Sequence, residues 1–190
     1  MNHLDDYIMV QSLIPTQLCR SLIREISLPK SKWSKHAWYH YGTDKKRSRP
    51  EKELDVVNAT EEQFKLLGKY LVIALQNYRK KYSTEKNPLD SAWAQSISLT
   101  RFNRYKVGTN MRSHYDHIQS LFDGKLKGIP ILSFVGLLNN NYKGGAFMCR
   151  EKEIKLRRGD ILLFPSNFMY PHKVKKITKG IRYSFVCWAF

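Results

Sequence analysis

Three residues in the C-terminal half of the chain have side chains that bind metal ions, at a spacing that would let them act together. His114 and Asp116 lie two positions apart, so on an extended strand both side chains leave the same face. His172 is the candidate third ligand. Two imidazoles and one carboxylate on one side of an iron(II) ion leave positions open for a bidentate co-substrate and O₂. The three residues therefore fit a catalytic iron site rather than a closed structural one, and hydrogen-bonded histidines without a metal stay open as the alternative.

A fourth candidate, Arg182, stands near the start of the most apolar segment of the sequence, residues 181–190. A buried arginine needs an anionic partner, and its forked N–H groups match a carboxylate. Asp160 is the only acid in the last 37 residues and belongs to a predicted turn, so an internal ion pair stays open as the alternative. His172 and Arg182 are both even-numbered, so a hairpin with an odd loop between them would turn both side chains toward the same interior. A dicarboxylate would then fit between the metal ion and the guanidinium.

The elements that must position these residues fall into two groups, and the first is helical. Apolar side chains recur every four residues over 15–27, with Thr16 as candidate N-cap. Thr60 opens a capping box that is followed by an apolar stripe and by basic residues 79–81. Between the two helices, residues 30–49 interleave lysines and arginines with Trp33 and Trp38, which predicts a long basic-aromatic loop with one strand.

The second group is β-structure. Runs rich in β-branched and aromatic residues at 96–105, 131–138 and 161–164 alternate with Gly, Asn and Pro. We expect an α+β, mainly β fold: a double-stranded β-helix, or jelly roll, with N-terminal helices packed on one face. Residues 1–190 would form a single domain, in which 1–88 supply helical support and the basic-aromatic loop and 89–190 the β-barrel catalytic core.

Composition limits the setting. A net charge of +17 indicates attraction to a polyanion such as nucleic acid or a ribosome, or else only well-solvated faces. Three cysteines at wide spacings predict reduced, buried thiols. No apolar run approaches the roughly 18–20 residues of a membrane span, and no targeting segment is evident, so we expect a cytoplasmic protein. The oligomeric state is not indicated.

Residues 99–190 resemble the 2-oxoglutarate (2OG) and Fe(II)-dependent oxygenases of the prolyl 4-hydroxylase type. The matching motifs are Tyr105 with Gly108, His114 with Asp116, residues 137–139, 144–147, 158–160 and 164–166, and His172 with Arg182. The resemblance covers about half of the chain and implies that His114, Asp116 and His172 bind iron. In one departure, the strand over 134–138 lacks the tyrosine that some relatives use to hold the co-substrate.

The same resemblance implies roles for residues around the co-substrate. Arg182 would pair with the distal carboxylate of 2OG, and Tyr105 would line the same pocket. Trp188, six residues beyond Arg182 on the same strand face, would form a bulky wall. Ordinary core packing is the alternative for Tyr105 and Trp188.

The implied activity is hydroxylation of a peptidyl proline or another protein side chain, with Fe(II), 2OG and O₂ as cofactors and ascorbate as a further candidate. Succinate and CO₂ would be released. A nucleic-acid-modifying oxygenase of the same class is the alternative if the basic-aromatic stretch stacks bases. A non-catalytic basic barrel that binds nucleic acid or ribosomes is another. A zinc hydrolase would fit two His and one Asp but would leave Arg182 unexplained.

Overall fold

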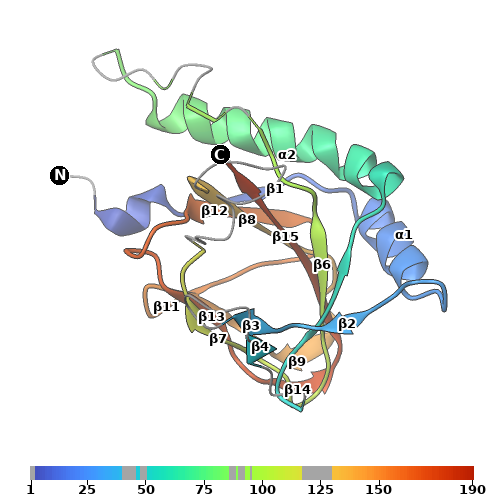
Figure 1. The fold of residues 1–190 in the computed structure, drawn as a ribbon. Helices are drawn as coiled ribbons and strands as arrows, with labels where there is room; N and C mark the ends of the chain where they lie inside the picture. The colour runs from blue at the N-terminus through green and yellow to red at the C-terminus, as the bar shows by residue number, and fades with distance from the viewer. Residues whose placement is uncertain are drawn as a thin grey trace.

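The computed structural model describes residues 3–39, 46–47, 51–85, 89, 93–94, 96–116 and 130–190. In these residues the chain forms two facing antiparallel sheets, and the helices lie beside the larger one (Figure 1). The fold is mainly β with few helices, as the sequence predicts. Among the described residues, no helix has the length and apolar character needed to cross a membrane.

The large sheet has seven strands, and its centre is fully buried. In spatial order they are β1 (Met9–Ser12), β12 (Asp160–Pro165), β8 (Leu132–Leu137), β15 (Arg182–Ala189), β6 (Arg101–Tyr105), β5 (Asp55–Asn58) and β2 (Ser34–Lys35). Every residue of β8 is buried because both of its faces are covered. At Gly136 a Cβ would stand 2.0 Å from the ring of Phe185 on β15. Any larger residue at position 136 would therefore clash with that ring.

The small sheet has four strands, in the order β11 (Lys152–Ile154), β10 (Phe147–Cys149), β13 (His172–Val174) and β7 (Met111–His114). Two further pairs are β14 (Ile177–Gly180) with β9 (Tyr142–Gly144), and β3 (Trp38–Tyr39) with β4 (Lys46–Arg47). The predicted hairpin from His172 to Arg182 is wrong. β13 belongs to the small sheet and β15 to the large one, since β14 leaves to pair with β9. The two residues therefore approach each other from opposite sheets.

The helices begin and end close to the predicted positions. They are α1 (Thr16–Ile26) and α2 (Glu61–Tyr82), with a short 3₁₀ turn η1 (Leu4–Tyr7) before them. The capping box at Thr60 is confirmed: Gln63 N donates to Thr60 Oγ1 at 3.3 Å, and Thr60 N donates to Gln63 Oε1 at 3.0 Å. Thr16 as N-cap is wrong. Pro15 occupies that position, and its fixed φ of −59° leads directly into the first turn.

The apolar core lies between the helices and the large sheet. Cys19 and Leu22 of α1 and Leu71 of α2 share one buried cluster with Phe134 and Phe185 of the sheet. A second cluster fills the space between the two sheets. All three cysteines are free and buried, which confirms the prediction. The basic-aromatic stretch contains β2, β3 and β4 rather than one strand, while residues 40–45 and 48–50 lie outside the described part.

Candidate functional site

The structure brings His114, Asp116 and His172 together between the two sheets. Their ligand atoms all lie within 4.8 Å of one another. The Nε2 atoms of His114 and His172 stand 3.4 and 3.6 Å from Asp116 Oδ1. A metal ion with bonds of about 2.1 Å holds neighbouring ligand atoms about 3 Å apart. The three side chains therefore need only a small adjustment to share one ion.

Both imidazoles are held in the tautomer that a metal ion requires. Nδ1 of His114 donates to the carbonyl of Arg112 at 2.8 Å, and Nδ1 of His172 donates to the carbonyl of Tyr170 at 3.2 Å. The proton on each Nδ1 leaves the lone pair of Nε2 free, and the backbone bond fixes the ring orientation. Each Nε2 points to Asp116, so the free lone pairs converge.

The carboxylate is positioned by two serines. Ser133 donates to Asp116 Oδ2 at 2.7 Å, and its hydroxyl also contacts that of Ser166 at 2.8 Å. The Asp116 N–H donates to the Ser166 carbonyl at 3.2 Å, which fixes the backbone after β7. Oδ2 is thus occupied by Ser133, whereas Oδ1 faces the imidazoles.

Electrostatics hold these groups in the protonation states that metal ligands need. Burial works to raise the pKa of Asp116, but His172, His114 and Ser133 outweigh it and hold the pKa below its usual range. Burial lowers the pKa of His172 to about 4, although Asp116 pulls it upward. At neutral pH the carboxylate is ionised and the imidazole is neutral, as ligation requires.

Arg182 lies in the same cavity and has no anionic partner in the described part of the chain. It is 1% exposed. Nη1 donates to Ser184 Oγ at 2.9 Å, and Nε has no hydrogen-bond partner. Asp160, the internal acid considered from the sequence, lies at the start of β12, where it accepts from Arg157 N at 2.7 Å. The guanidinium is therefore a buried donor that can receive a carboxylate.

Tyr105 and Trp188 line the same cavity as Arg182 and the three ligand residues. Tyr105 is opposite Arg182 in the pairing of β6 with β15, and its ring centre is 5.1 Å from the Arg182 guanidinium carbon. Burial raises the pKa of Tyr105, so its hydroxyl keeps its proton at neutral pH. Trp188 Nε1 is buried and has no hydrogen-bond partner among the residues that the structure describes.

The basic-aromatic stretch packs against the metal-ligand candidates. The ring of Trp38 contacts the ring of His114 edge-on, with 5.2 Å between ring centres. The guanidinium carbon of Arg112 lies 4.5 Å from the Trp38 ring centre, and Trp38 Nε1 donates to Glu53 at 3.3 Å. Trp33 is covered by Arg104 at 4.3 Å. These two aromatic faces are engaged within the protein, which disfavours base stacking by them.

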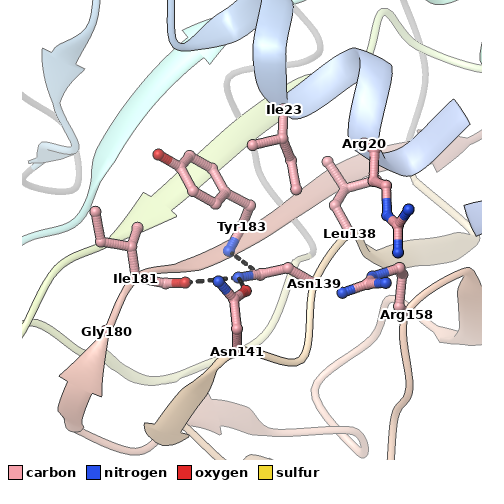
Figure 2. Close-up of a pocket in the computed structure, with 9 residues that line it drawn as sticks. All are labelled: Arg20, Ile23, Leu138, Asn139, Asn141, Arg158, Gly180, Ile181 and Tyr183. Carbon is pink, nitrogen blue, oxygen red and sulfur yellow. Dashed lines mark hydrogen bonds between the residues drawn. The ribbon is translucent and has the colours of Figure 1, made fainter. Parts of the chain in front are cut away.

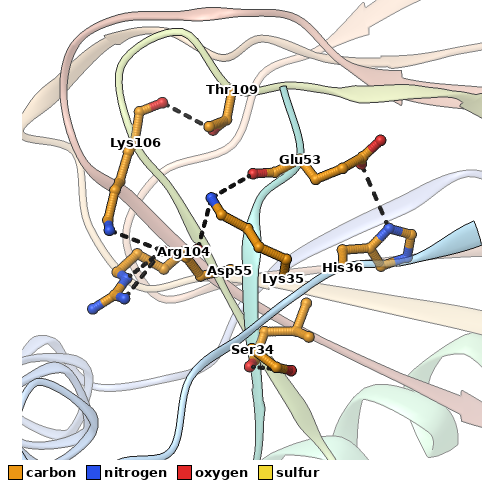
Figure 3. Close-up of polar contacts among 9 residues, drawn as sticks. Ser34, Lys35, His36, Glu53, Asp55, Arg104, Lys106 and Thr109 are labelled. Carbon is orange, nitrogen blue, oxygen red and sulfur yellow. Dashed lines mark hydrogen bonds and ion pairs between the residues drawn. The ribbon is translucent and has the colours of Figure 1, made fainter. Parts of the chain in front are cut away.

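An ion-pair cluster on the neighbouring strands secures this stretch (Figure 3). Asp55 accepts from Lys35 at 2.9 Å, from Arg104 Nη2 at 3.0 Å and from Lys106 at 3.2 Å. Burial works to raise the pKa of Asp55, but Lys35, Lys106 and Arg104 outweigh it and hold the pKa below its usual value. Lys35 also donates to the Glu53 carbonyl at 3.1 Å, so β2 is tied to the chain segment that carries β5.

A second hollow lies on the other side of the large sheet, beside α1 (Figure 2). Asn139 lies at the base of this hollow, where its side chain donates to the Ile181 carbonyl at 2.7 Å and accepts from Tyr183 N at 2.8 Å. Arg20 and Arg158 lie at its edge. The described residues that line it include no imidazole, thiol or carboxylate, so metal chemistry belongs to the other cavity.

Sequence reasoning missed three residues of the site. Ser133 is a polar side chain in the apolar strand β8. Arg101 lies four residues before Tyr105 on β6 and so on the same strand face, which is the signal that could have found it. Trp38 is predicted only as part of the basic-aromatic loop, since the sequence carries no signal for a partner 76 positions away. His117 follows Asp116 directly, so on a strand its side chain would point away from the metal pair and we expect it to be structural; it lies outside the described residues.

The comparisons with known proteins agree with one another. Residues 100–190 match the family model of the 2OG-Fe(II) oxygenase superfamily. A PKHD-type hydroxylase of Prochlorococcus marinus is 35% identical over 120 residues, which cover 60% of this chain and 51% of that protein. The chain spans about half the length of the curated relatives it matches.

Solved structures share the fold. A Pseudomonas putida prolyl-4-hydroxylase superposes with a TM-score of 0.66 at 18% identity, covering 96% of this chain and 92% of that one. A Trichoplax adhaerens prolyl hydroxylase, solved with a hypoxia inducible factor oxygen degradation domain peptide fragment, gives 0.70 at 17% identity, covering 97% and 83%. The resemblance drawn from the sequence is confirmed.

Proposed function

Residues 100–190 belong to the 2OG-Fe(II) oxygenase superfamily, and we propose that the protein hydroxylates a peptidyl proline or another protein side chain. The reaction would insert one oxygen atom of O₂ into a C–H bond and use the other to convert 2OG to succinate and CO₂. The observation that carries the proposal is a preorganised His-Asp-His triad in one cavity with a buried arginine that lacks an anion.

The donor set fits iron. His114, Asp116 and His172 would bind Fe(II) through two neutral Nε2 atoms and one carboxylate oxygen, leaving the side toward the cavity open. When bound, the metal supplies the activation of O₂ that no side chain can provide. The protein's own contribution is to fix both rings through backbone carbonyls and the carboxylate through Ser133.

The side chains that line the cavity also suit the chemistry of the co-substrate. Arg182 would bind the distal carboxylate of 2OG through its unpartnered Nε, and Tyr105 would donate its hydroxyl. Trp188 would wall the cavity near the metal. A single domain over 1–190, built as a jelly roll with N-terminal helices on one face, would hold the two sheets at the spacing that 2OG requires.

A protein substrate is favoured over nucleic acid. The peptide in the Trichoplax adhaerens complex supports a polypeptide substrate. Trp33 and Trp38, two of the aromatics in the basic-aromatic stretch, are engaged by Arg104, Arg112 and His114. The net charge of +17 would then serve to attract an acidic protein partner.

The test is succinate formation from 2OG by anaerobically iron-loaded protein that is then exposed to O₂, with and without proline-rich peptides. Fe(II)-dependent turnover should be lost in Arg182→Ala, while iron binding, measured separately by calorimetry, should persist. If the wild-type protein binds neither Fe(II) nor 2OG, the oxygenase proposal fails and the non-catalytic barrel becomes the better description.

A further inference from the structure

The cavity that holds the metal-ligand candidates has a closed end and an open end. At the closed end Arg182, Tyr105 and Ser184 are almost completely buried. Toward the other end Arg101, His114 and Trp188 are partly exposed, although they line the same cavity. Arg101 lies four residues before Tyr105 on β6, so it is displaced along the strand from the Arg182 end.

Arg101 is a cation without a counter-ion in the described part of the chain. Its Nε is buried and has no hydrogen-bond partner, and its guanidinium carbon stands 5.7 Å from the ring centre of Trp188. Burial lowers the pKa of Arg101, whereas Tyr105 and, to a smaller extent, Asp116 raise it. Trp188 Nε1 is also unpartnered. Both orphan groups are donors only, so their missing partner must be an acceptor.

Further charged groups lie near this open end: the Arg112 guanidinium, and the buried Glu53 carboxylate, which stands 3.7 Å from His36 Nδ1. Burial, and then the charge of Arg101, lower the pKa of the neighbouring His36 to about 3. Arg112, which also acts on His36, lies over Trp38 beside His114. Arg101 and Arg112 are therefore the cations near this end, and Glu53, which already accepts from Trp38 Nε1, is the anion beside them.

A count of charges shows that the co-substrate leaves one of them unmatched. The cavity has three formally charged side chains, Arg101, Arg182 and Asp116. Together with a bound Fe(II) they would carry three positive charges, and doubly negative 2OG would cancel two. One positive charge would remain at the end of the cavity away from Arg182, where the substrate must enter. The part of Arg101 that is buried, its Nε, is costly to leave without an acceptor.

From these observations, and resting on the proposed function, we propose that Arg101 and Trp188 form a second carboxylate-binding subsite that receives an acidic side chain of the polypeptide substrate next to the residue that is hydroxylated. Arg101 would contribute a charge-assisted hydrogen bond from Nε, and Trp188 would donate from Nε1. The protein would thereby select prolines that have a glutamate or aspartate neighbour.

Capped tetrapeptides test this subsite. Proline is placed beside Glu, Gln or Lys, and binding to the anaerobic Fe(II)-2OG form of the full chain is measured by calorimetry. The wild-type protein should bind the Glu peptide at least about tenfold more tightly than the Gln peptide, as a charged hydrogen bond predicts. In Arg101→Gln that ratio should fall below about twofold, and Arg101→Lys should restore part of it.

Two controls separate this role from others. Arg104→Gln makes the same change on the same strand, but its side chain pairs with Asp55 outside the cavity, so the peptide preference should stay. The affinity for 2OG should change less than about twofold in Arg101→Gln, because the subsite serves the substrate.

Each contrary outcome has a definite meaning. If wild-type protein does not distinguish the Glu from the Gln peptide, including the case in which neither binds, the subsite proposal is overturned. If Arg101→Gln loses 2OG affinity about tenfold instead, Arg101 serves the co-substrate and the substrate role is wrong. Failure of the wild-type protein to bind Fe(II) or 2OG, seen before any peptide is added, would overturn the proposed function itself.

Discussion

Arg182 lies directly opposite Tyr105 where β15 pairs with β6, and the Tyr105 ring covers one face of its guanidinium at 5.1 Å. Ser184 accepts from Nη1, whereas Nε has no partner. The Tyr105 ring and the Ser184 hydroxyl offset only part of the free-energy cost of burying the Arg182 guanidinium, because neither group carries a negative charge. The pair is therefore arranged for an anionic ligand at the expense of stability in its absence.

Arg182→Met should separate stability from binding. In the ligand-free protein the free energy of unfolding should stay the same or rise, because an uncompensated buried charge is removed. The affinity for 2OG should fall by at least about 100-fold, since one partner of a buried charge pair is lost. Urea denaturation and anaerobic calorimetry measure the two quantities.

Arg104→Met provides the matched control for that experiment. Arg104 pairs with Asp55 at 3.0 Å, so this variant should lose stability and keep its 2OG affinity. A loss of stability in Arg182→Met similar to that in Arg104→Met would mean that Arg182 has an internal acidic partner after all.

Tyr105→Phe tests whether the hydroxyl has a function beyond packing. The ring over Arg182 is kept, while one hydrogen bond to 2OG is lost, so the dissociation constant should rise about three- to tenfold. The melting temperature should change little. An unaltered 2OG affinity would leave Tyr105 as a core residue, the alternative already open from the sequence.

Ser133→Ala should weaken metal binding although Ser133 is not a ligand. Its hydroxyl donates to Asp116 Oδ2 at 2.7 Å and keeps Oδ1 directed at the two imidazoles. Loss of such a supporting contact costs about 10- to 100-fold in metal affinity. Competition with a metal-sensitive dye measures it. Ser98→Ala removes another buried serine, one that accepts from Trp188 N, and should leave metal affinity unchanged.

Part of the candidate site could be predicted because its chemistry is local in sequence. His114 and Asp116 share a strand face at a spacing of two, and Arg182 is conspicuous as a charge in an apolar strand. The helix at Thr60 was predictable for the same reason, since a capping box needs only four consecutive residues. In these cases the determining contacts lie within one element.

Contacts between elements could not be predicted in the same way. The even spacing of His172 and Arg182 predicts that both side chains face one interior, but it does not show whether the two residues lie in the same hairpin. They do not, because β14, which lies between them in the chain, pairs with β9. The approach of Trp38 to His114 depends on how β3 folds back over the small sheet. Tertiary packing, rather than any local pattern, decides both arrangements.

Asp55→Asn should destabilise the protein in a pH-dependent way. Asp55 is buried and accepts ion pairs from Lys35, Arg104 and Lys106, so its loss should cost about 1–3 kcal/mol at pH 7. Its pKa in the folded state lies below the ordinary value of 3.8. A depressed pKa stabilises the folded state above the ordinary value, and this contribution is lost as the pH falls through the folded pKa.

Urea denaturation of wild-type protein and Asp55→Asn measures this contribution at roughly pH 7, 5 and 3. The first two pH values lie above the ordinary pKa of Asp and the third lies below it. The difference should be equal at the two higher pH values and smaller at the lowest. Glu61→Gln is the control: Glu61 pairs with Lys65 at 2.8 Å, but both side chains are largely exposed, so about 0.5 kcal/mol or less is expected. A difference for Asp55→Asn as small as that of the control would show that the cluster in Figure 3 contributes nothing to holding β2 and β5 beside the site.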